Sequence, residues 1–328
     1  MNFNKSLIIS FLITVALASS SLYAGTWKSG SSFSINGYRE YKVYIPSGLT
    51  KTHKAHLVVM LHGCEQSAED FGKGTRISEW AEKEKFVALL PEQNTLYNPF
   101  KCWNWVMPYN NLRGGEPAAI IEMMDAVTND YNLDKENVYA AGMSAGASMV
   151  NILGNCYPER FKALGSQDGT QYYASSTGID FSDVVLKGAS VPSAVAAKTG
   201  YNCSAGVTKR PAIMPIIIFA GMNSPLMSPI HASQVEDEFK IFNDYLDNGV
   251  KDNSYFKANE VLKVQETNTY GYSLYKTVNK QNVVFIERYM IEKLGHDWSG
   301  GISDLEYNDP LGPDATALMV KFFKRFGL

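Results

Sequence analysis

The chain has 328 residues, of which 45% are hydrophobic and 19% are charged, a composition typical of a globular protein with a sizeable core. Thirty basic residues against 33 acidic ones give a net charge of -3, and no basic run is long enough to neutralise a series of phosphates. These numbers argue against disorder and against a nucleic-acid partner. Length alone allows one large domain or two ordinary ones.

The N-terminus departs from this even composition. Lys5 precedes an apolar run from Leu7 to Ala18, and small residues follow up to Ala24. This order predicts a secretory signal peptide over residues 1–24, cleaved after Ala24 or, as the second choice, after Ala18. A membrane anchor is the alternative, but the run is shorter than the ~20 residues that span a bilayer. We therefore expect a secreted or periplasmic protein with no stable membrane span after processing.

Short apolar runs alternate with amphipathic segments along the rest of the chain. The expected strands are, in order, residues 40–45, 56–61, 86–90, 138–142, 163–166, 213–219 and 283–289. The expected helices cover about 76–84, 117–131, the residues after Ser144, 232–248 and 315–326. This alternation predicts an α/β fold with a mainly parallel sheet, helices on both faces and right-handed crossovers.

Residues 171–210 lack any periodicity and predict an irregular excursion over the sheet, either a lid or a substrate-facing loop. No internal repeat and no convincing linker interrupts the pattern elsewhere. Residues 25–328 are therefore expected to form one catalytic domain.

The strongest local motif is G-x-S-x-G at residues 142–146 (GMSAG), directly after an expected strand and directly before an expected helix. A sharp strand-to-helix turn requires small residues, and it lifts the hydroxyl of Ser144 clear of the sheet. The helix N-terminus behind it favours developing negative charge. The pattern predicts an α/β-hydrolase fold with Ser144 as nucleophile; the alternative is a small-residue turn with a solvated serine.

A serine hydroxyl needs a base to remove its proton, and the chain offers five histidines. Three of them have no motif around them and are expected to be structural or solvated: His53, His56 and His231. His62 lies in residues 61–64 (LHGC) at the end of a strand, where a structural or oxyanion-loop role fits better. His296 lies in a glycine-rich loop after the last strand, residues 295–301 (GHDWSGG), where this fold places its base.

Ester cleavage also needs hydrogen-bond donors for the tetrahedral oxyanion. One backbone N–H is expected from the residue after the nucleophile, Ala145, and the other from the loop after His62, at Cys64. The reaction needs no metal and no organic cofactor. Its partner is an ester substrate, either a small molecule or an oligomer.

Export makes the four cysteines interpretable, because disulfides persist in oxidising compartments. The four are Cys64, Cys102, Cys156 and Cys203. Their spacing contains neither a CxxC motif nor the histidine pattern of a zinc site. Two disulfides are therefore expected, and the sequence leaves three pairings open. Buried free thiols are the alternative.

With these residues in view, the sequence resembles the poly(3-hydroxybutyrate) depolymerase-type esterases, a family that also contains secreted feruloyl and acetylxylan esterases. The resemblance runs from about residue 41 to 298 and is carried by six segments in order: 61–64 (LHGC), 91–93 (PEQ), 102–105 (CWNW), 113–116 (RGGE), 142–146 and 295–301. It implies hydrolysis through an acyl-serine. In that family the cysteines matching Cys64 and Cys102 are usually bonded, which favours a second pair of Cys156 and Cys203.

The resemblance fails at the catalytic acid. Family members typically carry His-Gly-x-x-Asp after the strand that ends here at Phe219, and this Asp orients the histidine. Residues 220–224 are AGMNS, so Ser224 occupies the acid position. We expect Asp168, at the end of the strand after the nucleophile helix, to replace it, with its carboxylate roughly 2.7–3.0 Å from Nδ1 of His296. An ordinary Asp-Gly turn is the alternative for Asp168.

Three tryptophans in the motif loops are candidates for an aromatic substrate surface, with core packing as the equal alternative: Trp103, Trp105 and Trp298. The expected substrates are hydroxyalkanoate oligomers or small aryl or acetyl esters. Because the usual acid is missing, the second hypothesis is a secreted binding protein or pseudoenzyme that keeps the pocket without efficient turnover. A peptidase on the same fold is the third.

Overall fold

The computed structural model describes residues 25–50, 54–207, 209–265 and 268–328. The expected signal peptide, residues 1–24, lies outside the described residues. Among the described helices, none combines the length and the apolar composition that crossing a bilayer requires.

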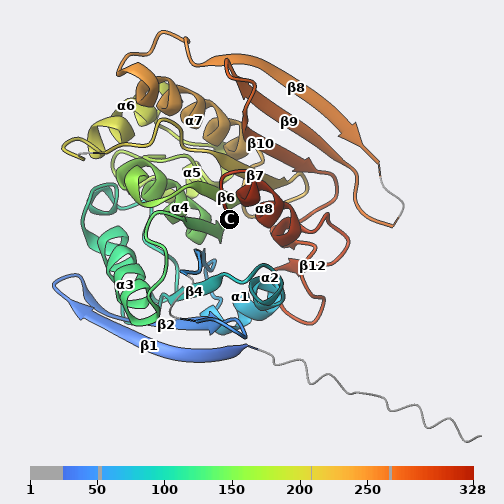
Figure 1. The fold of residues 1–328 in the computed structure, drawn as a ribbon. Coiled ribbons are helices and arrows are strands. Elements are labelled where there is room, and N and C mark those ends of the chain that lie inside the picture. The colour runs from blue at the N-terminus through green and yellow to red at the C-terminus, as the bar shows by residue number, and fades with distance from the viewer. Residues whose placement is uncertain (1–24, 51–53, 208, 266–267) are drawn as a thin grey trace, which may run out of the picture.

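A ten-stranded sheet organises the chain, in the order β1-β2-β4-β3-β5-β6-β7-β10-β9-β8 (Figure 1). Its strands are β1 (Thr26–Ser34), β2 (Gly37–Ile45), β3 (Leu57–Leu61), β4 (Val87–Glu92), β5 (Val138–Met143), β6 (Ala163–Gln167), β7 (Ile216–Gly221), β8 (Phe256–Val264), β9 (Tyr272–Asn279) and β10 (Val284–Ile291). From β4 to β10 along the sheet all neighbours are parallel, whereas the outer strands on both sides are antiparallel. The expectation of a mainly parallel sheet is confirmed.

The central strands are buried on both faces because their residues are almost all apolar. β3 (LVVML) and β7 (IIIFAG) are buried at every position. By contrast, β8 is exposed along most of its length and β1 along much of it. Three strands were not predicted, β1, β8 and β9, because strands near a sheet edge carry polar residues and lack the continuous apolar run of a central strand.

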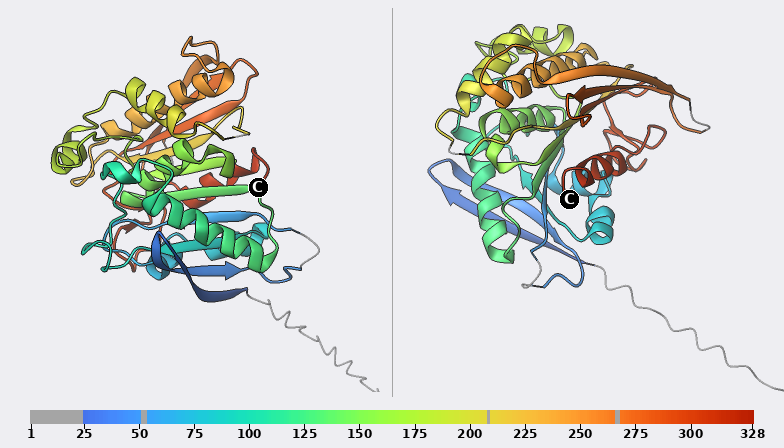
Figure 2. Two further views of the ribbon diagram at one scale, coloured as in Figure 1. Left: turned by 90° about the vertical axis from the view of Figure 1, so that its left-hand side faces the viewer. Right: turned by 45° about the horizontal axis from the view of Figure 1, so that its top comes forward.

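Helices cover both faces of the sheet (Figure 2). They are α1 (Ala68–Gly74), α2 (Ile77–Glu84), α3 (Gly115–Tyr131), α4 (Ala145–Cys156), α5 (Phe181–Lys187), α6 (Ser193–Cys203), α7 (Ile230–Asn248) and α8 (Ala315–Lys324), with short 3-10 turns at Pro108–Asn110 and Pro158–Arg160. Successive residues of a strand point to opposite faces, so Val59 enters the core under α3, α4 and α7, and Val58 the core under α1, α2 and α8. Two short strands, β11 (Trp298–Ser299) and β12 (Asn308–Asp309), pair outside the main sheet.

The structure corrects the expectation of an irregular excursion over residues 171–210, because α5 and α6 form within it. The buried face of α6 consists of small residues, including Ala196, Ala197 and Gly200. A Cβ on Gly200 would lie 1.9 Å from the side chain of Asn155, so α6 approaches α4 very closely. Small residues produce a weak hydrophobic period, which is why no helix was predicted here.

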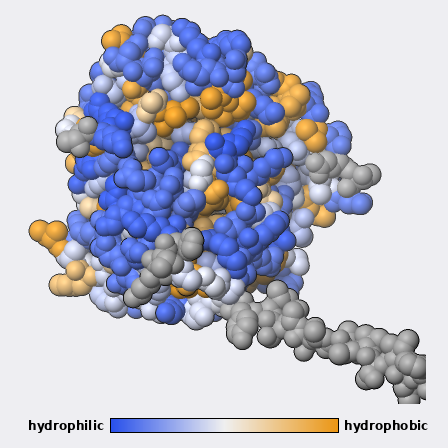
Figure 3. All heavy atoms as spheres, in the orientation of Figure 1, coloured by the Kyte–Doolittle hydropathy of each residue, from blue (hydrophilic) through white to orange (hydrophobic). Residues whose placement is uncertain are grey.

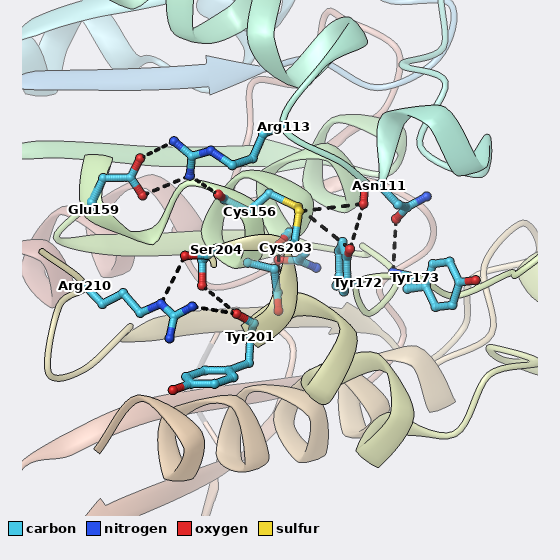
Figure 4. The surroundings of a disulfide bond; sticks show 12 residues. Asn111, Arg113, Cys156, Glu159, Tyr172, Tyr173, Tyr201, Cys203, Ser204 and Arg210 are labelled. Atoms are coloured by element: carbon cyan, nitrogen blue, oxygen red, sulfur yellow. Dashed lines mark hydrogen bonds and ion pairs between the residues drawn. A yellow bond between two sulfur atoms is a disulfide. The ribbon is translucent and has the colours of Figure 1, made fainter. Parts of the chain in front are cut away.

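A disulfide between Cys156 and Cys203 bonds the end of α4 to the end of α6, with the predicted pairing. Figure 4 shows the polar contacts around it. Arg113 donates to the carbonyl of Cys156, and the hydroxyl of Tyr172 donates to the carbonyl of Asn111 at 2.8 Å. Segments that are distant in the sequence are thus held around one covalent link, which fixes α6 and the residues that lead to α5.

The surface seen in Figure 3 is mostly hydrophilic, with apolar atoms projecting where Figure 1 places the turn between β1 and β2. Phe33 and Ile35 at this turn are 84% and 100% exposed. Glu40 pairs with Glu92 in antiparallel register, so β2 begins where β4 ends. The turn therefore lies on the side of the sheet where the parallel strands have their carboxyl ends.

One carboxyl group in α7 is buried without a cation beside it. Glu238 is fully buried, and neither its carboxyl oxygens nor the amide oxygen of Asn155 has a hydrogen-bond partner among the described residues when the acid is taken as ionised. Burial raises the pKa of Glu238 well above its ordinary value. A protonated Glu238 can donate to the Asn155 amide oxygen, which leaves neither group unsatisfied.

We expect Glu238→Gln to stabilise the protein by about 1–3 kcal/mol at about pH 8 and to have little effect near pH 4. Because the pKa of Glu238 is higher in the folded state than in the unfolded state, where it is about 4.3, wild-type stability falls as the pH rises from there toward the folded pKa, whereas glutamine has no such loss. Urea unfolding at the two pH values measures the difference. The exposed Glu260→Gln is the matched control. A stability gain that is the same at both pH values would contradict this account.

Candidate active site

The turn between β5 and α4 holds Ser144 in a strained left-handed backbone conformation, with φ 54° and ψ -120°. Its amide donates to the carbonyl of Gln167 in β6 at 2.8 Å. A Cβ on Gly142 would lie 2.6 Å from the backbone of Gly146, and a Cβ on Gly146 would lie 2.2 Å from the carbonyl oxygen of Leu61. The two glycines of the motif are therefore required by the close approach of α4 to β5 and β3.

His296 lies in the loop between β10 and β11 and lines the same pocket as Ser144. Its side chain is only 9% exposed, and this burial lowers the pKa of His296 to about 4, because the imidazolium would lose its hydration. The ring is therefore neutral at pH 7, the state that can accept a proton. A Cβ on Gly221 would lie 2.0 Å from the carbonyl of Gly295, so the end of β7 packs directly against this loop.

Asp168 directly follows β6, and its Oδ2 lies 3.7 Å from Nδ1 of His296. The structure brings the two groups together as expected, but at a distance longer than the predicted 2.7–3.0 Å. Nδ1 of His296 has no hydrogen-bond partner among the described residues. The carboxylate instead accepts from the amide of Gly221 at 3.0 Å and from the side chain of Gln167 at 3.2 Å.

Ser224, at the position that the family resemblance assigns to the acid, makes a local turn instead. Its hydroxyl oxygen accepts a hydrogen bond from the amide of Met227 at 3.0 Å. The amide of Asn223 donates to Leu294 at 3.0 Å, which ties this loop to the base loop. The loop supplies Leu226 and Met227 to the pocket, so it forms an apolar wall there.

The ionisation of Asp168 is governed by its burial. The pKa of Asp168 is raised to about 7, chiefly by loss of hydration and to a smaller extent by the neighbouring Asp297, while the hydrogen bonds from Gly221 and Gln167 lower it. Above this pH the pair consists of a carboxylate and a neutral imidazole. That is the state in which a carboxylate stabilises the imidazolium formed during proton transfer.

The loop after β3 lies against the nucleophile, since a Cβ on Gly63 would be 3.4 Å from Cβ of Ser144. The amide of Gly63 is occupied, because it donates to Oε1 of Gln66 at 2.8 Å. The carbonyl of Gly63 lies 2.7 Å from Nδ1 of His62. This carbonyl and the N–H of Cys64 belong to one planar peptide unit and point in opposite directions, so His62 sets the direction of the Cys64 N–H.

The tautomer of His62 follows from its two contacts. The amide of Gln93 donates to Nε2 at 3.0 Å, so the ring proton is on Nδ1 and is donated to Gly63. Burial lowers the pKa of His62 to about 4, which keeps the ring neutral. The side chain of Gln93 in turn donates to Glu116 at 2.5 Å and to the carbonyl of Cys102 at 3.0 Å. His62 is thus a buried structural residue of this loop.

A disulfide joins Cys64 to Cys102, again with the predicted pairing, and so bonds this loop to the segment after β4. In the chain-entropy estimate a closed loop of this size contributes about 4 kcal/mol. Ala145 begins α4, where the first amides of a helix have no acceptor within the helix. Cys64 thus lines the pocket with Ser144, and Ala145 directly follows Ser144 at the start of α4; their role as oxyanion donors stays a prediction.

None of the three tryptophans lines the pocket that holds Ser144 and His296. Trp103 and Trp298 are 1% exposed and Trp105 is 5% exposed. The indole N–H of Trp298 donates to Thr316 at 3.0 Å, within the core under α8. Of the three, only Trp105 packs against a pocket-lining residue: the centroid of its ring lies 5.7 Å from that of Phe181, which lines the pocket. Core packing, the alternative for all three, describes their positions.

The pocket has a volume of about 220 Å³. Besides Ser144, His296, Gly63 and Cys64, its lining includes residues that were not predicted from the sequence: Glu65, Gln66, Met143, Phe181, Val185, Leu226, Met227 and Tyr307. Glu65 and Gln66 directly follow the motif at His62, so their position gave a usable signal. Phe181 and Val185 belong to α5, in the segment expected to face the substrate. Tyr307 lies in no motif, so no sequence signal indicated its position in the pocket.

Comparison with known proteins relates this site to esterases. The family model described as Esterase PHB depolymerase matches residues 39–261. Poly(3-hydroxyalkanoate) depolymerase C of Paucimonas lemoignei is 27% identical over 297 residues, covering 89% of this chain and 66% of that protein. Feruloyl esterase B of Neurospora crassa is 30% identical over 131 residues, covering 39% of this chain and 43% of that protein. The chain spans less than two thirds of the length of each of these relatives.

Among solved structures, an acetyl xylan esterase from Aspergillus awamori aligns with a TM-score of 0.66 at 18% identity, covering 83% of this chain and 94% of that one. The acylaminoacyl peptidase of Pyrococcus horikoshii aligns with a TM-score of 0.56 at 15% identity, covering 93% of this chain and 42% of that one. At such identities the likeness concerns the fold alone. The expected α/β-hydrolase fold is confirmed.

If Asp168 acts through His296, kcat/KM should rise with pH through about 7, because the carboxylate must lose its proton before it can stabilise the imidazolium. We expect Asp168→Asn to lower kcat about 10³- to 10⁴-fold and to remove this limb of the pH profile. The exposed Asp183→Asn, which loses only an ion pair with Lys187, is the control. Turnover close to that of the wild type, with the limb retained in Asp168→Asn, would show that another group is the acid.

Proposed function

Because the chain belongs to the Esterase PHB depolymerase family, we propose that it is a serine esterase that hydrolyses carboxylic esters through an acyl-Ser144 intermediate. The observation that carries the proposal is the convergence of three elements on one pocket. Ser144 stands on the strained turn after β5, the neutral His296 lines the same pocket, and Asp168 lies 3.7 Å behind that ring.

In the first half-reaction the hydroxyl oxygen of Ser144 attacks the ester carbonyl while Nε2 of His296 takes its proton. Negative charge then develops on the carbonyl oxygen, and the amides of Cys64 and Ala145 are the donors that stabilise it. The C–O bond to the alcohol breaks as His296 returns the proton to the leaving oxygen. Asp168 stabilises the imidazolium during both transfers, which the gap of 3.7 Å allows once it shortens with substrate bound.

In the second half-reaction water attacks the acyl-serine, with His296 again accepting a proton and then returning it to Ser144. The acid product leaves and the enzyme is restored. Every step uses side chains and amides of this chain, so the mechanism calls for no metal and no organic cofactor.

The substrate follows from the size of the pocket and from the names of the relatives. A volume of about 220 Å³ is small for a ligand site and suits a short acyl or alkyl group beside the scissile bond. The named relatives are a poly(3-hydroxyalkanoate) depolymerase, feruloyl esterases and acetylxylan esterases. We therefore place the natural substrate among small aryl or acetyl esters and the ends of hydroxyalkanoate oligomers.

The proposed site of action is outside the cytoplasm, in the periplasm or the medium. Residues 1–24 have the sequence pattern of a secretory signal. The two disulfides support the proposal, because such bonds persist in oxidising compartments.

A second function has one specific observation in its favour. The family acid position holds Ser224, and Nδ1 of His296 has no hydrogen-bond partner among the described residues. A secreted binding protein that keeps the pocket but turns over poorly would have these features. The two functions differ in whether Ser144 is an activated nucleophile.

Ser144→Ala is expected to reduce hydrolysis of a p-nitrophenyl acetate by about 10⁴-fold or more, because no other group can form the acyl-enzyme. A fluorophosphonate probe should label the wild type at Ser144 and leave the variant unlabelled. The exposed Ser176→Ala is the matched control. Failure of the probe to label the wild type would favour the binding protein, and unchanged turnover in Ser144→Ala would exclude the mechanism.

A further inference from the structure

One wall of the pocket is polar and has no role in the mechanism. The hydroxyl of Tyr307 donates to Oε2 of Glu65 at 2.7 Å, and both residues line the pocket with Ser144 and His296. Glu65 follows the oxyanion loop, whereas Tyr307 lies between β11 and β12, so two loops far apart in the sequence meet here. Much of the remaining lining is apolar: Met143, Phe181, Val185, Leu226 and Met227.

Both residues of the pair have a left-handed backbone, with φ 63° for Glu65 and φ 60° for Tyr307. Glycine adopts this conformation without strain, whereas any residue with a Cβ does so at a cost. Main-chain bonds hold both positions, because the amide of Glu65 donates to Phe100 at 2.7 Å and the amide of Trp298 donates to Tyr307 at 2.8 Å. The chain thus carries a carboxylate and a phenol at two strained positions on the pocket wall, where strain is associated with function.

The oxygen atoms of this pair that remain free to form hydrogen bonds can only accept them. Tyr307 uses its hydroxyl proton on Glu65, and this hydrogen bond, with burial, raises the pKa of Tyr307 to about 12, so the phenol stays protonated and only its oxygen remains free. The Glu65 carboxylate accepts one bond and has further lone pairs. No lysine or arginine occurs among the described residues that line the pocket. The wall therefore suits a hydrogen-bond donor and repels an anion.

Resting on the esterase function proposed above, we infer that Glu65 and Tyr307 are specificity-determining residues that accept hydrogen bonds from a hydroxyl group of the ester and exclude esters that bear a carboxylate. The apolar wall contacts the short alkyl group of the ester, and Glu65 and Tyr307 accept hydrogen bonds from its hydroxylated group. The preferred substrate class is then an ester with a neutral, hydroxyl-bearing group, as in an ester of a polyol or sugar. The interior of a polyester chain offers acceptors only and is the poorer ligand.

Two series of esters of similar size test this inference, one for each side of the scissile bond. The alcohol series is ethylene glycol monobutanoate, propyl butanoate and carboxymethyl butanoate. The acyl series is ethyl β-hydroxybutanoate, ethyl butanoate and monoethyl succinate. In at least one series the wild type should show kcat/KM about tenfold higher for the hydroxyl ester than for the alkyl ester, with the carboxylate ester lowest.

Glu65→Gln should raise kcat/KM for the carboxylate ester about tenfold and leave the alkyl ester within about twofold, because the amide keeps the shape and removes the charge. Tyr307→Phe should lower the preference for the hydroxyl ester by a similar factor. The matched controls are Glu69→Gln and Tyr109→Phe, two exposed residues outside the pocket. Changes that are equal for all three esters would assign the pair a structural role and overturn the inference.

The outcomes also separate this inference from the proposed function. If the wild type hydrolyses the esters without distinguishing hydroxyl, alkyl and carboxylate groups, the esterase function stands and the role of the pair is wrong. If it hydrolyses none of them and Ser144 is not labelled by a fluorophosphonate, both proposals are overturned.

Discussion

The site depends on the close approach of α4 to the strands beneath it. Gly146 lies against the carbonyl of Leu61 at a distance that admits no Cβ, and Gly142 lies against Gly146 at a distance that also admits none. This contact leaves the chain between β5 and α4 no relaxed conformation and holds Ser144 above the sheet. It also brings the end of β3 beside the nucleophile, so the same packing that fixes Ser144 positions the loop that carries Cys64.

Burial then decides the charges around this turn. The low dielectric of the interior opposes ionisation of Asp168 and of His296 alike, which shifts their pKa values in opposite directions and leaves the imidazole neutral at pH 7. His62 is kept neutral by the same cause and acts as a fixed hydrogen-bond bridge between Gly63 and Gln93. Buried polar groups here mainly hold backbone in place, and the polar pair of Glu65, which is exposed, and Tyr307, which is half-buried, is left to meet the substrate.

The two disulfides restrain segments on or behind two walls of the pocket. Cys64–Cys102 restrains the oxyanion loop, and Cys156–Cys203 holds α6 against α4 behind the segment that carries α5. The loop after β7, where the family resemblance placed the acid, supplies Leu226 and Met227 to the pocket. The carboxylate proposed as the acid, Asp168, follows β6, whereas the apolar wall follows β7, and these two strands lie side by side in the sheet.

The sequence by itself determined the α/β alternation and predicted Ser144 as nucleophile and His296 as base, because short-range motifs and apolar runs carry that information. It also indicated Asp168, since adjacent parallel strands end at the same edge of a sheet. Only the tertiary structure decided the gap of 3.7 Å between Asp168 and His296, the burial of Trp103 and Trp298, and the edge strands β1, β8 and β9. It alone brought Tyr307 to Glu65, because a contact between loops so distant in the chain depends on how every intervening element packs, which no local pattern records.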